Sequence, residues 1–132
     1  MSKENFEPHL IFSYTRKMAI GDGVLIDVTA NAAEVGFSLH TVVTDNLFHG
    51  YVVPPAGLDG LDGEGQSMLG RLHDLLMLAR VAAGGQPDGD RVSFKVAFLM
   101  RPGHLETVQV ILHIGPGDHG EAVLTLMLPE DD

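Results

Sequence analysis

The last third of the chain constrains the fold most, because apolar and polar residues alternate there in three runs. Side chains along a β-strand point to opposite faces in turn, so each run gives a strand with one apolar face. Turns rich in glycine and proline separate the runs and are short enough to reverse the chain. The pattern predicts a three-stranded antiparallel meander over residues 91–100, 105–114 and 122–128.

The second face of this meander is more apolar than a face in contact with water needs to be. It carries Ala97, Leu99, Ile111, Val123 and Met127. We expect either another element of the chain or a second subunit to cover it, and a homodimer is therefore one of the alternatives.

Residues 66–83 show the clearest helical periodicity in the sequence. Leucines flank the apolar face on both sides, and Arg71, Asp74 and Arg80 are expected to lie elsewhere on the helix. The predicted core-facing residues are Met68, Leu72, Leu75, Ala79 and Ala82.

The first third predicts two short helices on either side of a strand. Ser13 or Thr15 can cap the first helix, and Thr29 can cap the second, which Gly36 then ends in a left-handed conformation. The intervening sequence VLIDV is apolar and β-branched, which indicates a buried strand. The expected elements are a helix over 16–20, a strand over 24–28 and a helix over 30–35.

Residues 39–53 fit a helix by the spacing of their apolar side chains, yet Thr41–Thr44 are β-branched and favour a strand. Both readings remain open at this point. The glycine- and aspartate-rich segment 56–65 is expected to be an exposed loop.

Together these elements predict an α+β fold. We expect a three- to four-stranded, mainly antiparallel sheet with the C-terminal meander packed against one main helix and shorter N-terminal helices. Residues 1–9 are predicted to be a flexible arm, 10–129 a single domain and 130–132 an acidic tail.

The charge balance limits the classes of partner. The 132 residues include 8 Lys and Arg against 18 Asp and Glu, a net charge of -10 that disfavours direct binding to nucleic acid. The chain has no cysteine and no apolar stretch long enough to span a membrane. We therefore expect a cytoplasmic protein with no membrane contact, whose partner is an unidentified protein.

Four blocks of sequence resemble a family of small bacterial proteins of unknown function that are carried on plasmids and prophages. The blocks are Tyr14–Arg16 with Ala19–Val28, Ala33–Phe37, Gly70–Asp74 and Gly115–Pro129. His73 stands where the family usually has an aromatic residue. The resemblance implies a mobile-element setting and implies no activity.

A set of polar residues near the first block is the candidate binding site. These residues could bind a polar ligand if they converge in space. Alternatively, ordinary packing, ion pairing and turn formation explain why they are present. The candidates are Tyr14, Arg16, Asp22, Asp27 and Arg71. Asp27 interrupts a predicted buried strand, so it needs Arg16, Arg71 or, as we favour, the amides of the helix after Thr29 as partners.

No known catalytic motif occurs in the sequence, and the seven histidines lack the spacings that place two metal ligands on one face. We therefore expect no catalytic residues, no metal and no cofactor. The favoured interpretation is a non-catalytic protein-interaction module whose functional residues lie in the first third or in segment 56–65. The alternatives are a small enzyme or ligand-binding domain that uses the Tyr14, Arg16 and Asp27 region, and a structural subunit that only self-associates.

Overall fold

The computed structural model describes residues 14–58, 66–85 and 89–132. The predicted arm over residues 1–9 lies outside these ranges, and so does most of the predicted loop over 56–65. Within that loop Leu58 is described and is buried, so the start of the segment is anchored to the body of the protein.

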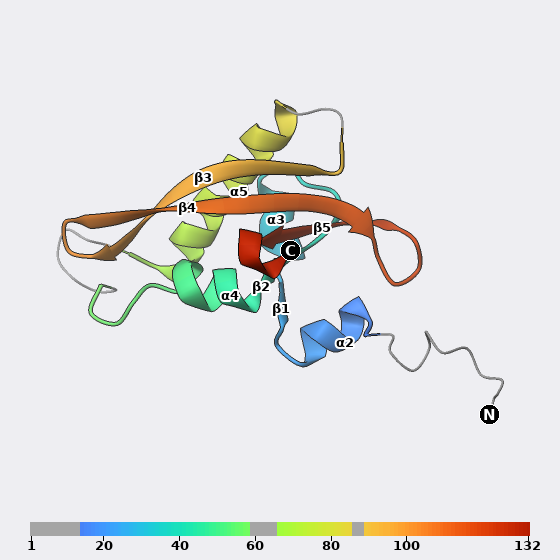
Figure 1. Ribbon diagram of the computed structural model, residues 1–132, viewed down its shortest axis with the longest axis horizontal. Helices are drawn as coiled ribbons and strands as arrows, with labels where there is room; N and C mark the ends of the chain where they lie inside the picture. The colour runs from blue at the N-terminus through green and yellow to red at the C-terminus, as the bar shows by residue number, and fades with distance from the viewer. Residues whose placement is uncertain (1–13, 59–65, 86–88) are drawn as a thin grey trace.

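The fold is α+β and is built on one five-stranded mixed sheet (Figure 1). The strands lie in the order β1-β2-β5-β4-β3, with β2 and β5 parallel and the other neighbours antiparallel. Their bounds are Leu25–Asp27 (β1), His40–Thr44 (β2), Arg91–Arg101 (β3), His104–Pro116 (β4) and Ala122–Met127 (β5).

The predicted meander is confirmed as β3, β4 and β5. The prediction of three or four mainly antiparallel strands was incomplete, because the sheet has five strands and one parallel pair. The predicted strand over 24–28 is present as β1, three residues long, and the fifth strand is β2, whose five residues were left open between helix and strand.

The helices are short apart from one. Thr15 caps the first of them and Ser67 caps the long one, each through its side-chain oxygen. Their bounds are Arg16–Gly21 (α2), Thr29–Glu34 (α3), Asp45–Leu47 (α4) and Met68–Gly84 (α5), with a π-helix over Phe48–Val52 (η1) and a 3-10 turn over Pro129–Asp131 (η2). Thr29 was expected to cap α3 and instead begins it, while its hydroxyl donates to Asp27.

The helix and strand predictions for residues 39–53 are each correct for part of the segment. The β-branched half forms β2, and the second half forms α4 and η1. Thr44 separates the two, since its extended backbone ends the strand and its hydroxyl accepts the amide hydrogen of Leu47.

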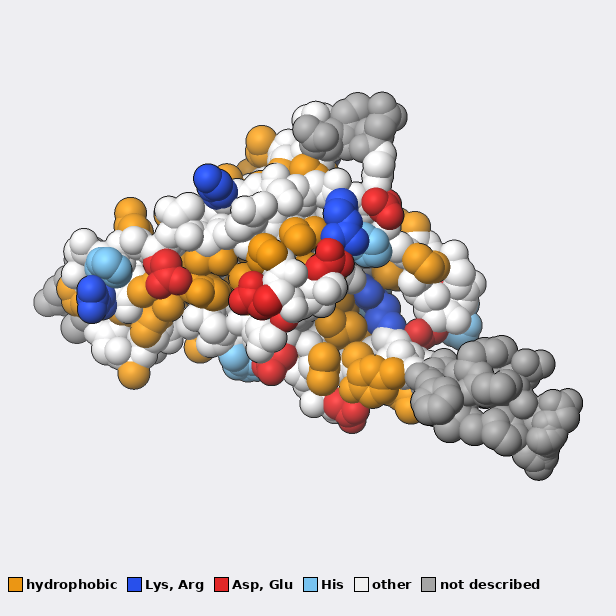
Figure 2. Space-filling view, viewed as in Figure 1, with side chains coloured by type: hydrophobic (Ala, Val, Ile, Leu, Met, Phe, Trp, Pro, Cys, Tyr) orange, Lys and Arg blue, Asp and Glu red, His pale blue; other side chains and the backbone are white. Residues whose placement is uncertain are grey.

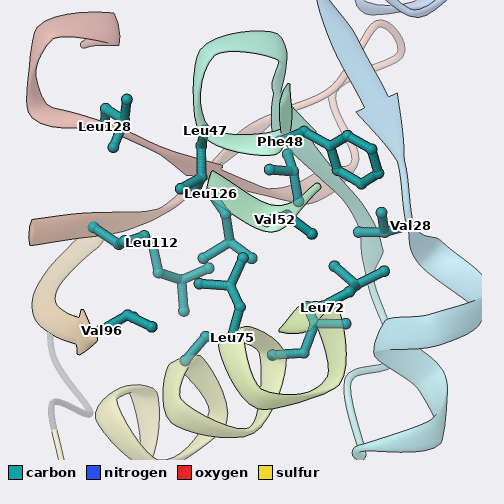
Figure 3. Packing of buried hydrophobic residues seen from close by; sticks show 14 of the residues in the cluster. Val28, Leu47, Phe48, Val52, Leu72, Leu75, Val96, Leu112, Leu126 and Leu128 are labelled. Atoms are coloured by element: carbon teal, nitrogen blue, oxygen red, sulfur yellow. The ribbon is translucent and has the colours of Figure 1, made fainter. Parts of the chain in front are cut away.

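The main core lies between the sheet and the helices α3 and α5 (Figures 1 and 3). The predicted inner faces of β3, β4 and β5 all contribute to it. The orientation of α5 was predicted less well, because Met68, Leu69 and Leu78 are exposed and Arg71 is buried. Apolar residues lie on much of the surface of this helix, so periodicity alone does not determine which side of it faces the core. Hydrogen bonds from Arg71 to nearby carbonyl groups stabilise the observed rotation of the helix about its axis.

Elements of the same chain cover part of the sheet's second face. Ala19 of α2, Val42, Ile111, Val123 and Met127 are buried without belonging to the main core cluster. The C-terminal turn η2 packs on β4, and Asp131 accepts hydrogen bonds from Thr44 and Asn46. Residues expected to form an acidic tail are therefore part of this covering layer, whereas the outer part of the same face, along β3 and the start of β4, stays bare.

Candidate functional site

The N-terminus of α2 is held by the turn that joins β4 to β5. Asp118 accepts the backbone amide hydrogens of Arg16 and Lys17, at 2.8 and 3.0 Å. These two bonds lower the pKa of the Asp118 carboxyl below its usual value. The carboxylate therefore ties together segments about 100 residues apart in the sequence.

The side chain of Arg16 reaches from α2 onto the sheet. Its Nη2 donates to the carbonyl oxygen of Leu124 at 2.7 Å, and its Nη1 donates to Oγ1 of Thr125 at 3.0 Å. Its Nε donates to Nδ1 of His40 at 3.3 Å. Partial burial lowers the pKa of Arg16, against the opposing effect of nearby acids such as Asp118. Every nitrogen of the guanidinium is thus used to hold α2 on β2 and β5.

His40 links Arg16 to Asp27. Because its Nδ1 accepts from Arg16, the ring proton of the neutral form lies on Nε2, which is 3.3 Å from Oδ2 of Asp27. The other oxygen of Asp27 accepts from the amide and the hydroxyl of Thr29. Partial burial raises the pKa of Asp27, but the bonds from Thr29 and the nearby His40 outweigh it and lower the pKa.

The prediction that Asp27 lies in a buried strand is wrong. β1 is an edge strand of three residues, and the Asp27 side chain is 46% exposed. The expected role at the start of the following helix is close to what is observed, since the carboxylate accepts the Thr29 amide. Asp27 approaches Arg16 through His40, and Arg71 is not among its partners.

Tyr14 and Asp22 form a separate contact at the two ends of α2. The Tyr14 hydroxyl donates to Oδ2 of Asp22 at 2.7 Å, and this bond raises the pKa of Tyr14. The contact is exposed.

Arg71 lies on the opposite side of the sheet, in the main core. Its Nε donates to the Tyr51 carbonyl at 3.0 Å and its Nη1 to the Leu99 carbonyl at 2.8 Å. The guanidinium also lies over the ring of Phe98, 5.2 Å from its centre. Arg71 therefore joins α5 to η1 and β3 and does not belong with the other four candidates.

An open hollow of about 260 Å³ lies where α2 meets the β4–β5 turn. Two of the residues that shape it, His40 and Asp118, were not among the predicted site residues. The turn sequence GPGDHGE was a signal for Asp118, but no local pattern shows that its carboxylate reaches a helix so far away in the chain. Within the turn, Glu121 accepts the amide hydrogen of His119.

The polar groups around Arg16 already form hydrogen bonds with one another. Both ring nitrogens of His40 face a partner, and neither partner is a hydroxyl group that the ring could activate as a nucleophile. Within the described ranges, no group of three or more His, Asp or Glu side chains is placed to hold a metal ion. The arrangement serves as a clamp between α2 and the sheet.

Comparison of the sequence with known protein families identifies the family of this chain but no activity. Residues 3–132 match a family of unknown function, DUF6573. The chain belongs to this family. No curated protein and no solved structure matches it. None of the helices in the described ranges is both long and apolar enough to cross a membrane.

We expect Arg71→Ala to destabilise this family member by about 2–4 kcal/mol, because two partly buried carbonyl groups lose their donor and the buried Arg71 side chain leaves a cavity. Urea unfolding followed by circular dichroism measures the change. Arg101→Ala is the matched control, since Arg101 is exposed, and it should change the free energy of unfolding by less than about 0.5 kcal/mol. Equal effects of the two substitutions would contradict the role given to Arg71.

The clamp should also depend on pH through Asp118. Because the folded-state pKa of Asp118 is lowered, its stabilising effect is complete above the usual pKa and is lost as the pH falls through the lower value. The urea midpoint of Asp118→Asn should therefore be below that of the wild type at about pH 6, and the gap should narrow towards about pH 2. Asp74→Asn is the control, and a gap for Asp118→Asn that does not change with pH would contradict the assignment.

Proposed function

We propose that this protein is a non-catalytic interaction module that binds another protein through the outer side of α5. The observation that carries the proposal is a group of exposed apolar side chains on that helix, which we call the outer α5 patch. Its members are Met77 at 43%, Leu78 at 42% and Val81 at 71% exposure. They are spaced at i, i+1 and i+4 and so lie on one side of the helix.

The rest of the molecule supports this choice of surface. On the second face of the sheet α2 and η2 already bury the apolar residues of the inner strands, and the polar groups around Arg16 bond to one another. The outer α5 patch has no such cover within the described ranges. Exposed apolar groups that lie together are typical of protein–protein contact sites.

We further propose that the module acts in the cytoplasm and in the setting of a plasmid or prophage. The absence of cysteine in the sequence is compatible with a reducing compartment. The mobile-element setting rests on the sequence resemblance, and the genes that adjoin this one test it.

The test of the interaction is a comparative capture experiment. Tagged wild-type protein, Val81→Glu and Met18→Glu are used as baits in bacterial host lysate, and any protein that depends on Val81 is then purified for titration. Met18 is the matched control, because it is an exposed methionine on α2, across the sheet from α5. A charge placed in the outer α5 patch should weaken binding at least about tenfold, whereas Met18→Glu should leave it unchanged.

Two results would contradict the proposal. One is that no captured protein depends on Val81, with Val81→Glu shown by thermal unfolding to be as stable as the wild type. The other is that light scattering finds a dimer that Val81→Glu dissociates, which would favour self-association as the role of the patch.

A further inference from the structure

The outer edge of β3 offers backbone hydrogen-bonding groups to a partner. β3 is the last strand of the sheet and has 11 residues, and no strand in the described part of the chain pairs with its outer side. The Ile114 amide donates to the Asp90 carbonyl at 2.7 Å, which fixes the phase of the alternating ladder between β3 and β4. Phe94, Val96 and Phe98 therefore bond to β4. The residues whose amide and carbonyl groups face outwards are Ser93, Lys95, Ala97 and Leu99, and of these groups the Leu99 carbonyl already accepts from Arg71.

This strand is basic in an acidic protein. β3 contains Arg91, Lys95 and Arg101 and no acidic residue, so the other residues together carry -13, from -10 minus +3. Arg91 pairs with Asp132, whereas Lys95 and Arg101 make no ion pair within the described ranges. Figure 2 shows basic side chains along the upper edge and at the left tip of the β3–β4 hairpin, with apolar side chains exposed between them.

A hollow runs between this edge and α5. It has a volume of about 140 Å³, and residues of both elements line it, among them Asp74 of α5 and Ala97 and Leu99 of β3. Leu78 lies seven residues, or two turns, beyond Arg71, whose side chain reaches β3, so this member of the outer α5 patch faces the same side, while Val81 and Met77 lie roughly 80–120° further round the helix. An added strand would therefore have β3 beside it and the apolar side chain of Leu78 towards one of its faces.

We propose that the outer edge of β3 binds an extended segment of a partner protein in which acidic and apolar residues alternate. Main-chain hydrogen bonds to Ser93, Lys95 and Ala97 and to the amide of Leu99 would hold the segment as a sixth strand. Its acidic side chains would lie on the face of Lys95 and its apolar side chains would face α5, with a neutral residue opposite Asp74. This inference rests on the proposed function and names the chemistry of its partner.

The charge of β3 argues against a second copy as the occupant. In a two-fold antiparallel pairing centred on Val96, Arg91 would lie opposite Arg101 of the other copy, and the two Lys95 side chains would be diagonal neighbours. Like charges in these positions destabilise strand pairing. Basic residues on an edge strand discourage pairing between two copies of a protein. The same residues would favour an acidic strand over a basic one.

Synthetic eight-residue peptides with blocked ends and a fluorescent label test the proposal. One peptide alternates Glu with Val, the second alternates Lys with Val, and the third is the Glu–Val peptide with a central proline. Fluorescence anisotropy with the full chain at low salt measures binding. We expect binding of the Glu–Val peptide only, and at least a tenfold loss with Lys95→Glu but no loss with the matched charge reversal Lys17→Glu on α2.

Binding of the Lys–Val peptide with equal strength, or equal effects of Lys95→Glu and Lys17→Glu, would overturn the proposal. So would a dimer in light scattering that Ala97→Pro dissociates, because Ala97→Pro removes one outward amide and the edge would then pair with a second copy. If a captured partner depends on Val81 but no acidic peptide binds, this inference fails and the interaction role of α5 stands. If no partner depends on Val81 and the Glu–Val peptide still binds, the interaction role of α5 fails and strand binding at the β3 edge stands.

Discussion

The parallel pairing of β2 with β5 is the interaction on which the rest of the structure depends. It joins residues 40–43 to residues 123–126 and so unites the N-terminal third with the C-terminal meander in one sheet. On one face this junction carries Val43 and Leu126, which are fully buried in the main core. On the other face it carries His40 and Thr125, which receive the side chain of Arg16. Without the pairing, the N-terminal and C-terminal parts of the core would not meet, and Arg16 would not reach β2 and β5 together.

The pairing also explains why the two ends of the sheet differ. Near the junction both faces are covered, by α3 and α5 on one side and by α2 and η2 on the other, and polar side chains such as Asp118 and Asp131 bond to backbone or hydroxyl groups. β3 lies two strands away from the junction, and Asp132, the residue after η2, pairs with it at its first residue, Arg91. Its long outer edge and the adjacent side of α5 are what remains for a partner to bind.

The sequence predicted the elements with strong periodicity and missed those that depend on distant contacts. The meander and α5 were predicted because alternation persists over ten residues in each of the first two runs of the meander and helical spacing persists along the whole of α5. The role of β2 could not be predicted, since five residues that are mostly β-branched fit either a helix or a strand until a partner strand is known. The position of Asp27 was misjudged for a related reason, because an apolar run does not show whether its strand lies inside a sheet or at its edge.

The candidate site was predicted in part. Arg16 and Asp27 belong to one network, but the residue that links them, His40, and the carboxylate that holds α2, Asp118, were not foreseen. Arg71 was grouped with them by residue type alone, and the structure places it across the sheet. Functional residues were expected in the first third or in segment 56–65, and so outside α5 and the meander. That view changed because the burial of side chains and the free edge of a sheet become visible only once the strand order is known.

Hydrogen exchange at single amides of the unbound protein measures most directly whether the outer edge of β3 is free to accept a strand. NMR-detected exchange should alternate along the strand. The amides of Ser93, Lys95, Ala97 and Leu99 should exchange at least about tenfold faster than those of Phe94, Val96 and Phe98, which bond to β4. Equally strong protection of both sets would show that the edge is already covered and that no partner strand can add to it.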